Sequence, residues 1–463
     1  MLVQVAGSFR DPSGHVYESN GAIFRAIAPF AARDYQAARD AGVFDRLVGE
    51  NKLVGLKEVD PTGLFTGTGA AAHLLEHPRI PFISYPYEWS FSLLRDAALF
   101  HLDLHLDLLE RGFTLSDASA YNVQFNGPHP IFIDHLSIRP YREGEFWAGH
   151  RQFCEQFLNP LLLRALFGVP HNAWYRGNLE GIPVSDLAKM LTAKHKLSWN
   201  ILAHVVLQNR FQQGAGKRAD VGKIKESRLP LAAFKGILTQ LRNWIARLTP
   251  DRIGATVWGD YATTNTYSSD EEQAKRRFIG EFVKATKPKS VIDLGCNTGE
   301  YSKVALDAGA ERALGFDFDQ QALDRAHHRA KDQSLNFLPL FLDAKNPSPE
   351  QGWLQTERTG HAVRAKADAV FALAFEHHLA IAHNVPLDQV VGWITSMAPT
   401  GVIEFVPKND ETVQRMLSLR EDIFPNYTVE AFEAALASHA RVERRDVISQ
   451  SGRTLYAFDR GEA

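Results

Sequence analysis

The sequence has few cysteines and no excess of charge of one sign. Only two of its 463 residues are cysteines, Cys154 and Cys296, so neither a disulfide framework nor a zinc site built on cysteines is expected. Lysine and arginine (51) nearly balance aspartate and glutamate (54), which leaves a formal net charge of −3. The chain therefore lacks a basic footprint for DNA or RNA, and nucleic acid is a disfavoured partner.

Long hydrophobic runs are also missing. Charged residues interrupt every apolar stretch well before the roughly 18 residues that a membrane span requires. The first residues, MLVQVAGSFRDPSG, do not place a basic region before an apolar run, so they do not read as a secretory signal. With so few cysteines, the simplest expectation is a reducing, cytoplasmic setting. Nothing in the sequence indicates the oligomeric state.

The chain divides into three stretches by pattern. Its length predicts two or three domains at roughly 150 residues each. Residues 1–140 mix strand and helix patterns, with a hairpin expected in HVYESNGAIFRAI and a helix in LFHLDLHLDLLERG that ends at Gly112. Residues 141–250 are mainly helical, and residues 251–463 alternate strands with helices. We therefore expect an α/β protein whose C-terminal domain has a parallel sheet, preceded by an α+β region with a helical lobe.

A glycine loop marks the first strand of the C-terminal stretch. In SVIDLGCNTGEYS, an apolar strand reaches Asp293 and is followed by a turn from Gly295 to Gly299 and then by a helix. Glycine lets a backbone turn sharply and approach a ligand closely. Asp317 ends the next strand, where its carboxylate could accept hydrogen bonds from both ribose hydroxyls of a nucleoside.

The loop differs from that of a dinucleotide site. It reads Gly-x-x-x-Gly rather than G-x-G-x-x-G, and Glu300 at the helix start would repel a pyrophosphate. S-adenosylmethionine has no pyrophosphate and carries a cationic sulfonium, and Asp293 with the loop backbone suits its amino-acid end. The alternative is a tight strand–helix turn with no ligand.

These residues resemble class I S-adenosylmethionine-dependent methyltransferases. The resemblance implies a Rossmann-like domain, with a mostly parallel seven-stranded sheet and helices on both faces. Asp343-Ala344 matches the family's acidic-small pair beside adenine, and Ala372 to Leu379 matches its transfer site; Asn297 departs from the usual glycine, although asparagine tolerates left-handed backbone. The expected cofactor-binding residues are Asp293, Gly295, Cys296, Asn297, Gly299, Asp317, Phe318, Asp343, Ala344 and Ala372.

Two adjacent histidines, His377 and His378, follow the fourth strand of this domain. Either one could be the general base that takes a proton from the methyl acceptor. The alternative is a histidine that only packs or orients the substrate, because positioning alone supplies much of the rate of such a reaction. The sequence does not choose between the two histidines.

A more specific resemblance covers most of the chain. The runs VIDLGCNTGEYS, IEFVPKND and REDIFPNYT, with SYPYEWSFSLLRDAALFHLDLHL and RQFCEQFLNPLLL nearer the start, resemble the bacterial NoeA-like family of host-specific nodulation proteins. This resemblance implies methyltransferase activity but fixes no acceptor. The residues Trp258, Tyr261 and Tyr267 could form an aromatic lid or could pack a helix on the sheet.

The N-terminal half carries a second constellation. Asp117, Asn122 and Asp134 have the spacing of the catalytic aspartate and the two magnesium ligands of kinase-like phosphotransferases, and Lys57 could be the phosphate-binding lysine. The half resembles the kinase-like fold, but Leu115 stands in place of the family's histidine and Asp134 is not followed by Phe-Gly. An active kinase binding Mg-ATP, a degenerate nucleotide-binding or scaffold domain, and coincidence all stay open. The His101–Asp107 run reads as an amphipathic helix, and no metal site is expected apart from magnesium on Asn122 and Asp134 if the kinase-like site is active.

We therefore expect a methyltransferase with S-adenosylmethionine as cofactor and a small-molecule or carrier-linked acceptor. The kinase-like region would bind the substrate or a nucleotide. Two alternatives are a bifunctional methyltransferase and phosphotransferase, and a non-catalytic regulatory protein that binds adenosylmethionine.

Overall fold

The structure, a computed structural model, describes residues 2–60, 71–209, 228–251, 269–418 and 420–461. It separates into an N-terminal unit (residues 1–126, 130–253 and 350–358) and a C-terminal unit (residues 127–129, 254–349 and 359–463). The two N-terminal stretches expected from the sequence, 1–140 and 141–250, thus fall in one unit. Trp258, Tyr261 and Tyr267, which the sequence suggested for an aromatic lid, lie outside the described residues.

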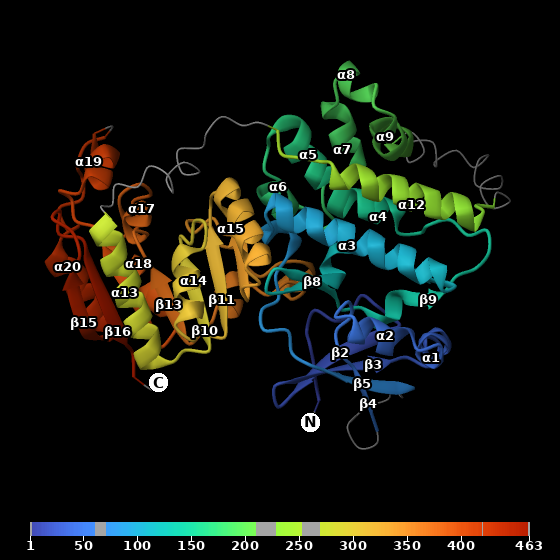
Figure 1. The fold of residues 1–463 in the computed structure, drawn as a ribbon, viewed down its shortest axis with the longest axis horizontal. Coiled ribbons are helices and arrows are strands. Elements are labelled where there is room, and N and C mark those ends of the chain that lie inside the picture. Colours follow the sequence, from blue (N-terminus) through green and yellow to red (C-terminus); the bar gives the residue numbers. More distant parts are fainter. Residues whose placement is uncertain (1, 61–70, 210–227, 252–268, 419, 462–463) are drawn as a thin grey trace. The chain divides into compact units, whose positions relative to one another are not determined.

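The N-terminal unit begins with a five-stranded antiparallel sheet in the order β1-β2-β3-β5-β4 (Figure 1). The expected hairpin is confirmed, because β2 and β3 pair along their whole length. Gly14 lies opposite Ile27 at one end, and Ser19 lies opposite Ala22 at the turn. Asn20 (φ 48°) and Gly21 (φ 79°) both have left-handed backbone, which is the turn that matches the twist of paired strands. The strands are β1 (Val3–Gln4), β2 (Gly14–Ser19), β3 (Ala22–Ile27), β4 (Lys57–Val59) and β5 (His73–His77).

A long buried helix, α3 (Phe91–Glu110), follows this sheet. Ser90 caps its start by accepting a hydrogen bond from the Leu93 amide, and Gly112 (φ 78°) ends it as predicted. His101 and His105 face the core and are fully buried, while Asp103 and Asp107 on the other face form ion pairs with arginines of the same unit. The helix is therefore amphipathic, with its two histidines in the core and its two aspartates in ion pairs on the other face.

Short two-stranded sheets and a set of helices complete the N-terminal unit. The two sheets pair β6 (Phe113–Leu115) with β9 (Ile138–Pro140) and β7 (Val123–Asn126) with β8 (His129–Phe132). The helices are α1 (Ala32–Asp40), α2 (Val43–Gly49), η1 (Pro86–Glu88), η2 (Ala120–Asn122), η3 (His135–Ser137), α4 (His150–Phe153), η4 (Cys154–Leu158), α5 (Asn159–Phe167), α6 (Asn172–Gly177), α7 (Val184–Met190), α8 (Ala193–Lys196), α9 (Trp199–Ile201), η5 (Leu202–Leu207) and α12 (Leu231–Ala246). Two of them, η4 and η5, are π-helical.

The C-terminal unit is built on a seven-stranded sheet in the order β12-β11-β10-β13-β14-β16-β15 (Figure 1). The five strands from β12 to β14 are parallel, and β16 runs antiparallel to both β14 and β15, so the α/β class is confirmed with a mixed sheet. The strands are β10 (Ser290–Leu294), β11 (Arg312–Asp317), β12 (Phe337–Phe341), β13 (Ala369–Ala372), β14 (Thr400–Phe405), β15 (Arg441–Val447) and β16 (Thr454–Asp459).

Helices cover both faces of this sheet because successive strand residues point to opposite sides. On one face, side chains such as Val291 and Phe371 pack with Phe278 of α13 (Ser269–Thr286) and Ala305 of α14 (Glu300–Asp307). On the other face, Phe405 contacts Phe432 of α20 (Val429–His439). The remaining helices are α15 (Gln320–Asp332), η6 (Trp353–Gln355), α16 (His361–Arg364), α17 (Glu376–Ala380), α18 (Leu387–Thr395) and α19 (Glu411–Leu417).

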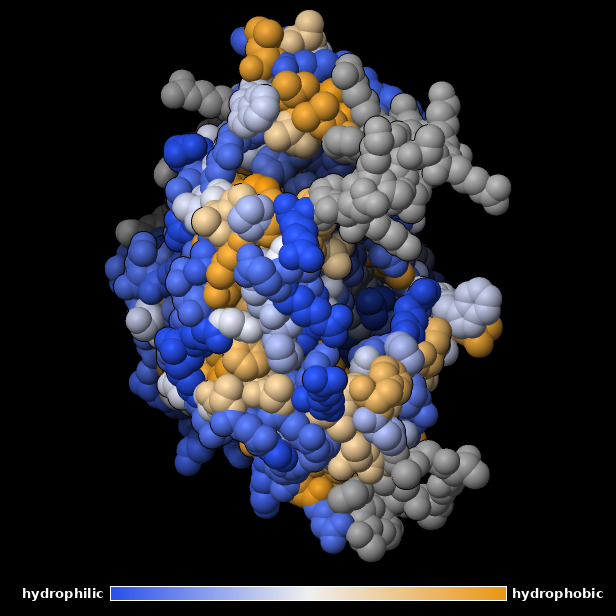
Figure 2. All heavy atoms as spheres, turned by 90° about the vertical axis from the view of Figure 1, so that its right-hand side faces the viewer, coloured by the Kyte–Doolittle hydropathy of each residue, from blue (hydrophilic) through white to orange (hydrophobic). Residues whose placement is uncertain are grey.

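The part of the surface drawn in colour in Figure 2 is largely polar. On the face seen in Figure 2, apolar side chains form small separate patches among hydrophilic ones, as is usual for a globular protein. Among the described residues, none of the helices combines the length and the apolarity that a membrane crossing requires.

A buried ion pair ties β16 to the start of α19. Arg453 donates from Nε and Nη2 to the two carboxylate oxygens of Asp410, each over 2.7 Å, and both side chains are almost fully buried. Asp410 also accepts a hydrogen bond from the Thr412 amide and so caps α19. Burial raises the pKa of Asp410, but the bonds and the charge of Arg453 outweigh burial and bring that pKa to about 2.

We expect Asp410→Asn to lower the free energy of unfolding by about 3 kcal/mol, because Arg453 would stay buried with only the more distant carboxylate of Glu404, 3.7 Å away, to balance its charge. The matched control is Asp422→Asn, since Asp422 pairs with Lys408 at the surface, where an ion pair contributes only about 0–1 kcal/mol. Urea titration read out by hydrogen exchange of the β16 amides measures both variants. Equal effects would contradict the argument.

The same pair predicts a pH dependence. The folded-state pKa of Asp410, about 2, lies below its ordinary value of 3.8, so the stabilisation is complete above about pH 4 and is lost as the pH falls towards 2. The difference in unfolding free energy between wild type and Asp410→Asn should therefore shrink over this interval.

Candidate functional site

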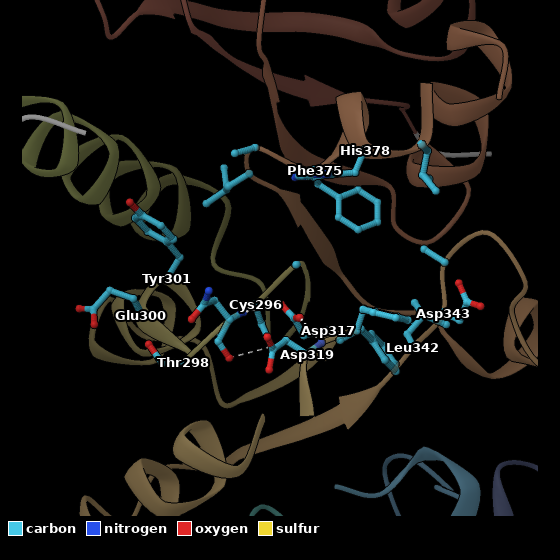
Figure 3. Close-up of a pocket in the computed structure, with 18 of the residues that line it drawn as sticks. Cys296, Thr298, Glu300, Tyr301, Asp317, Asp319, Leu342, Asp343, Phe375 and His378 are labelled. Atoms are coloured by element: carbon cyan, nitrogen blue, oxygen red, sulfur yellow. Dashed lines mark hydrogen bonds between the residues drawn. The ribbon is translucent and has the colours of Figure 1, made fainter. Parts of the chain in front are cut away.

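A pocket of about 590 Å³ lies at the carboxyl ends of the parallel strands in the C-terminal unit. Ligands of open α/β sheets bind at this edge because the loops there carry the variable side chains. Figure 3 shows Phe375 and His378 across the pocket from Asp317 and Asp319. The lining residues include Lys275, Gly295, Cys296, Asn297, Thr298, Glu300, Tyr301, Asp317, Phe318, Leu342, Asp343, Ala344, Phe375, His378, His383 and Met416.

The glycine loop forms one wall. Gly295 (φ 73°), Asn297 (φ 48°) and Gly299 (φ 79°) all have left-handed backbone, which is where asparagine is tolerated and where glycine is favoured. A Cβ added to Gly299 would lie 2.4 Å from the Phe337 ring. The loop therefore requires glycine at this position for both conformation and space.

Asp317 holds the loop from the neighbouring strand. One carboxylate oxygen accepts a hydrogen bond from the Asn297 amide and the other accepts one from the Asp319 amide, each over 2.8 Å. Burial raises the pKa of Asp317 to about 6 despite these bonds, so the group is mainly ionised at neutral pH. Because a carboxylate oxygen can accept more than one hydrogen bond, Asp317 can still bind donors in the pocket.

Three of the expected cofactor-binding residues, Asp293, Gly299 and Ala372, do not line the pocket. Asp293 is 2% exposed and accepts a hydrogen bond of 2.6 Å from the Ser302 hydroxyl, so it braces the start of α14 from below. Ala372 is fully buried within β13, and the next two residues, Leu373 and Ala374, line the pocket instead. The expectation that Asp293 meets the amino-acid end of a cofactor is therefore wrong for direct contact, because the strand turns this side chain into the protein.

The far end of the pocket combines acidic and apolar groups. Leu342, Asp343 and Ala344 follow β12 and line the pocket. Asp343 and Ala344 were expected there from the sequence. Phe318 is 60% exposed, and its ring centroid lies 5.9 Å from that of Phe341. A flat heterocycle with an exocyclic amine would find both a stacking surface and a carboxylate here.

The charge of Glu300 is balanced by two arginines. Glu300 forms ion pairs with Arg276 and Arg329, and although burial raises its pKa, these pairs lower the pKa below its usual value. The expected repulsion between Glu300 and a pyrophosphate is thus weakened by the two guanidinium groups. The loop spacing, rather than this charge, remains the argument against a dinucleotide.

A lysine that the sequence did not single out lies in the same pocket. Lys275 is 1% exposed and donates to Glu404 over 2.7 Å. Burial lowers the pKa of Lys275, and the charge of Glu404 opposes that effect. Nothing in the sequence joins Lys275 to the loop, because the two meet only when α13 packs against the sheet.

The structure separates the two adjacent histidines. His378 lines the pocket, whereas His377 is 1% exposed, lies 3.4 Å from the Glu376 carboxylate and does not line the pocket. Burial lowers the pKa of His378 well below its usual value, aided by His377 and His383. His378 is therefore neutral at physiological pH, and of the two histidines only His378 lines the pocket.

The kinase-like residues of the N-terminal unit also come together. The Asn122 side-chain amide donates to Asp117 over 2.9 Å and to Asp134 over 3.3 Å. Burial, with a smaller effect of Asp134, raises the pKa of Asp117 to about 6. Three residues spread along the sequence thus form one acidic cluster.

Lys57, which the sequence suggested as the phosphate-binding lysine, does not belong to this cluster. It is exposed at the start of β4 and pairs in register with Glu76. Arg25 of β3 instead donates to Asp134 over 2.7 Å, with both side chains largely buried. The cation beside Asp134 therefore comes from the N-terminal hairpin, which carries no motif that would have indicated it.

The comparisons with known proteins begin with a relative that matches nearly the whole chain. The chain is 53% identical over 461 residues to nodulation protein NoeA of Rhizobium meliloti, an alignment that spans 99% of this chain and 96% of NoeA. The chain belongs to the NoeA family. No protein-family model matches the chain.

More distant similarity is confined to part of the chain. A 63-residue stretch is 41% identical to ribosomal protein L11 methyltransferase of Haemophilus influenzae, covering 13% of this chain and 21% of that protein. Solved structures include the N-methyltransferase NodS of Bradyrhizobium japonicum (12% identity, 42% of this chain, 99% of NodS, TM-score 0.31) and PH0226 of Pyrococcus horikoshii (18% identity, 44% of this chain, 99% of PH0226, TM-score 0.31). The sheet order and the left-handed glycine loop of the C-terminal unit agree with the class I methyltransferase fold expected from the sequence.

Proposed function

We propose that this NoeA-family chain transfers a methyl group from S-adenosylmethionine to a small-molecule or carrier-linked acceptor. The observation that carries the proposal is Asp317, whose carboxylate is fixed by two backbone amides at the pocket wall beside the left-handed glycine loop. An ionised carboxylate at the end of the second strand is the acceptor that a ribose requires.

The chemical types of the pocket residues suit the three parts of adenosylmethionine. Asp317 would accept hydrogen bonds from the ribose hydroxyls, and Asp343 with Ala344 and Phe318 would contact the adenine. The backbone from Gly295 to Gly299 would face the amino-acid end. When bound, adenosylmethionine supplies an electrophilic methyl group.

His378 is the group that we propose for proton removal from the acceptor. It lines the pocket beside Phe375, and its lowered pKa keeps the imidazole neutral. With adenosylmethionine held by the residues above, an acceptor that gains its methyl group would have a proton to lose, and His378 would be the pocket residue to take it. A neutral imidazole can receive that proton.

We expect Asp317→Asn to weaken S-adenosylmethionine binding about 10- to 100-fold, because hydrogen bonds to a charged acceptor are worth about 1.5–3 kcal/mol each. Isothermal titration of the full chain with adenosylmethionine and adenosylhomocysteine measures this. The matched control is Asp368→Asn, since Asp368 bonds Ser290 at the opposite end of the sheet and does not line the pocket. Absence of binding by wild type, or unchanged binding by Asp317→Asn, would refute the cofactor assignment.

Replacing His378 by alanine should lower the methyl-transfer rate about 100-fold, the effect of losing a general base, while adenosylmethionine affinity changes less than about threefold. Label transfer from methyl-labelled adenosylmethionine to fractionated small molecules and carrier-linked intermediates gives the rate. His377→Gln is the paired control and should retain most activity. Equal losses of activity in both variants would mean that the two histidines act only in packing. Tight binding of adenosylmethionine without transfer of the methyl label to any fraction would favour a non-catalytic regulatory protein.

A second candidate function, nucleotide binding or phosphotransfer, rests on the cluster of Asp117, Asn122 and Asp134. Its carboxylate and amide oxygens suit a magnesium ion by kind. Arg25 forms an ion pair with Asp134 and so competes with a magnesium ion for that carboxylate. We therefore propose that this cluster binds a nucleotide rather than catalysing phosphotransfer.

If the N-terminal unit binds Mg-ATP, the full chain should gain several degrees in thermal midpoint at saturating nucleotide, and Asp134→Asn should abolish the gain. Asp103→Asn is a suitable control, because Asp103 forms an exposed ion pair elsewhere in the same unit. Differential scanning fluorimetry with magnesium alone, ATP alone and both together separates the contributions. An unchanged midpoint with Mg-ATP would leave the cluster a structural one.

A further inference from the structure

Three side chains of the N-terminal unit that bind metals well in other proteins converge at one point. His150 and Cys154 stand four residues apart, which places them on the same face of one helical run. His204 comes from a separate helical segment, η5 (Leu202–Leu207). The ligand atoms of this His150–Cys154–His204 cluster all lie within 4.8 Å of one another.

Two of the three separations are close to those around a small tetrahedral ion, and the ligand atoms of Cys154 and His204 lie within 4.8 Å of each other. His150 Nε2 lies 3.0 Å from His204 Nδ1, and Cys154 Sγ lies 3.7 Å from His150 Nε2. Zinc bonds of about 2.0–2.1 Å to nitrogen and 2.3 Å to sulfur imply nitrogen–nitrogen and nitrogen–sulfur separations of about 3.3 and 3.6 Å in a tetrahedral site. Shifts of a few tenths of an ångström bring these two pairs to that geometry, and closer approach of Cys154 Sγ and His204, which lie within 4.8 Å of each other, would complete it.

The surroundings of the cluster favour binding of an ion over three separate solvated groups. Cys154 is fully buried and His204 is 6% exposed, while His150 is only partly buried, which leaves one side from which water can reach the cluster. Trp147 lies beside His150, and Trp244 stacks with His204. The two tryptophans shield the ligand atoms, and water can supply the fourth ligand.

The backbone around the cluster is also unusual. Both Cys154 and His204 lie on π-helical segments, η4 (Cys154–Leu158) and η5. Such segments are rare and occur frequently at functional sites. Two of them, distant in sequence, present ligand atoms to the same point.

We propose that His150, Cys154 and His204 bind one borderline-soft transition-metal ion, with zinc as the natural occupant and water as the fourth ligand. Two imidazoles and one thiolate are a donor set that zinc accepts and that magnesium or calcium does not. The bound ion would link the helical run at His150 to η5. The proposal is independent of the methyltransferase pocket, which lies in the other unit.

Cobalt(II) substitution tests the site in the untagged full-length chain after removal of metals with a chelator. We expect one equivalent of cobalt to give visible d–d absorption and a sulfur-to-cobalt charge-transfer band in the near ultraviolet. Zinc should displace the cobalt and raise the thermal midpoint. A wild-type chain without cobalt absorption would overturn the proposal and leave a plain hydrogen-bond chain from Cys154 to His150 and His204.

Variants at the two cysteines show which thiol is involved. Cys154→Ser should remove the charge-transfer band and weaken zinc binding at least 100-fold, whereas Cys296→Ser, which alters the other buried cysteine, should change neither. His204→Gln keeps the thiol and should also weaken zinc at least 10-fold, and far-ultraviolet circular dichroism shows whether each variant folds. If Cys154→Ser fails to fold, native mass spectrometry of wild type before and after chelation still decides whether one zinc is held. Unchanged zinc affinity in both ligand variants would overturn the assignment.

Discussion

The left-handed turn from Gly295 to Gly299 is the constraint on which the pocket of the C-terminal unit depends. The amides of Gly295 and Cys296 donate to the Phe316 carbonyl, and the Asn297 amide donates to Asp317, so the loop is bonded to the end of β11. Gly315 of that strand has no room for a side chain, because a Cβ there would lie 2.6 Å from Cys296 Sγ. The two adjoining strand ends thus fix the wall against which a nucleoside would rest.

Buried charges lie in the same unit as the pocket, and one of them, Lys275, lines it. Lys275 pairs with Glu404, and Arg453 pairs with Asp410, so the interior beside β14 and β16 holds balanced charge. Buried pairs of this kind stabilise a fold only when each partner is present. The pocket therefore depends on elements that are far apart in the chain, from α13 to the last strand.

Much of the fold could be predicted because its signals are local. The turn at Asn20-Gly21 carries its own backbone preference, and the apolar runs at β10, β11, β13 and β14 need no partner to be recognised. The candidate sites were predicted less completely. Asp293 and His377 have the right residue types in the right motifs, but the direction in which a side chain points is set by packing, and both point away from the pocket.

The sequence by itself determined the α/β class, the glycine loop, Asp317 at the end of the second strand and the spacing of Asp117, Asn122 and Asp134, because each of these depends on neighbours along the chain. Only the tertiary structure decided that His378 faces the pocket, that Arg25 pairs with Asp134 and that Cys154 meets two histidines. These contacts join segments separated by long stretches of chain. Their formation depends on how helices and strands pack, which no local pattern encodes.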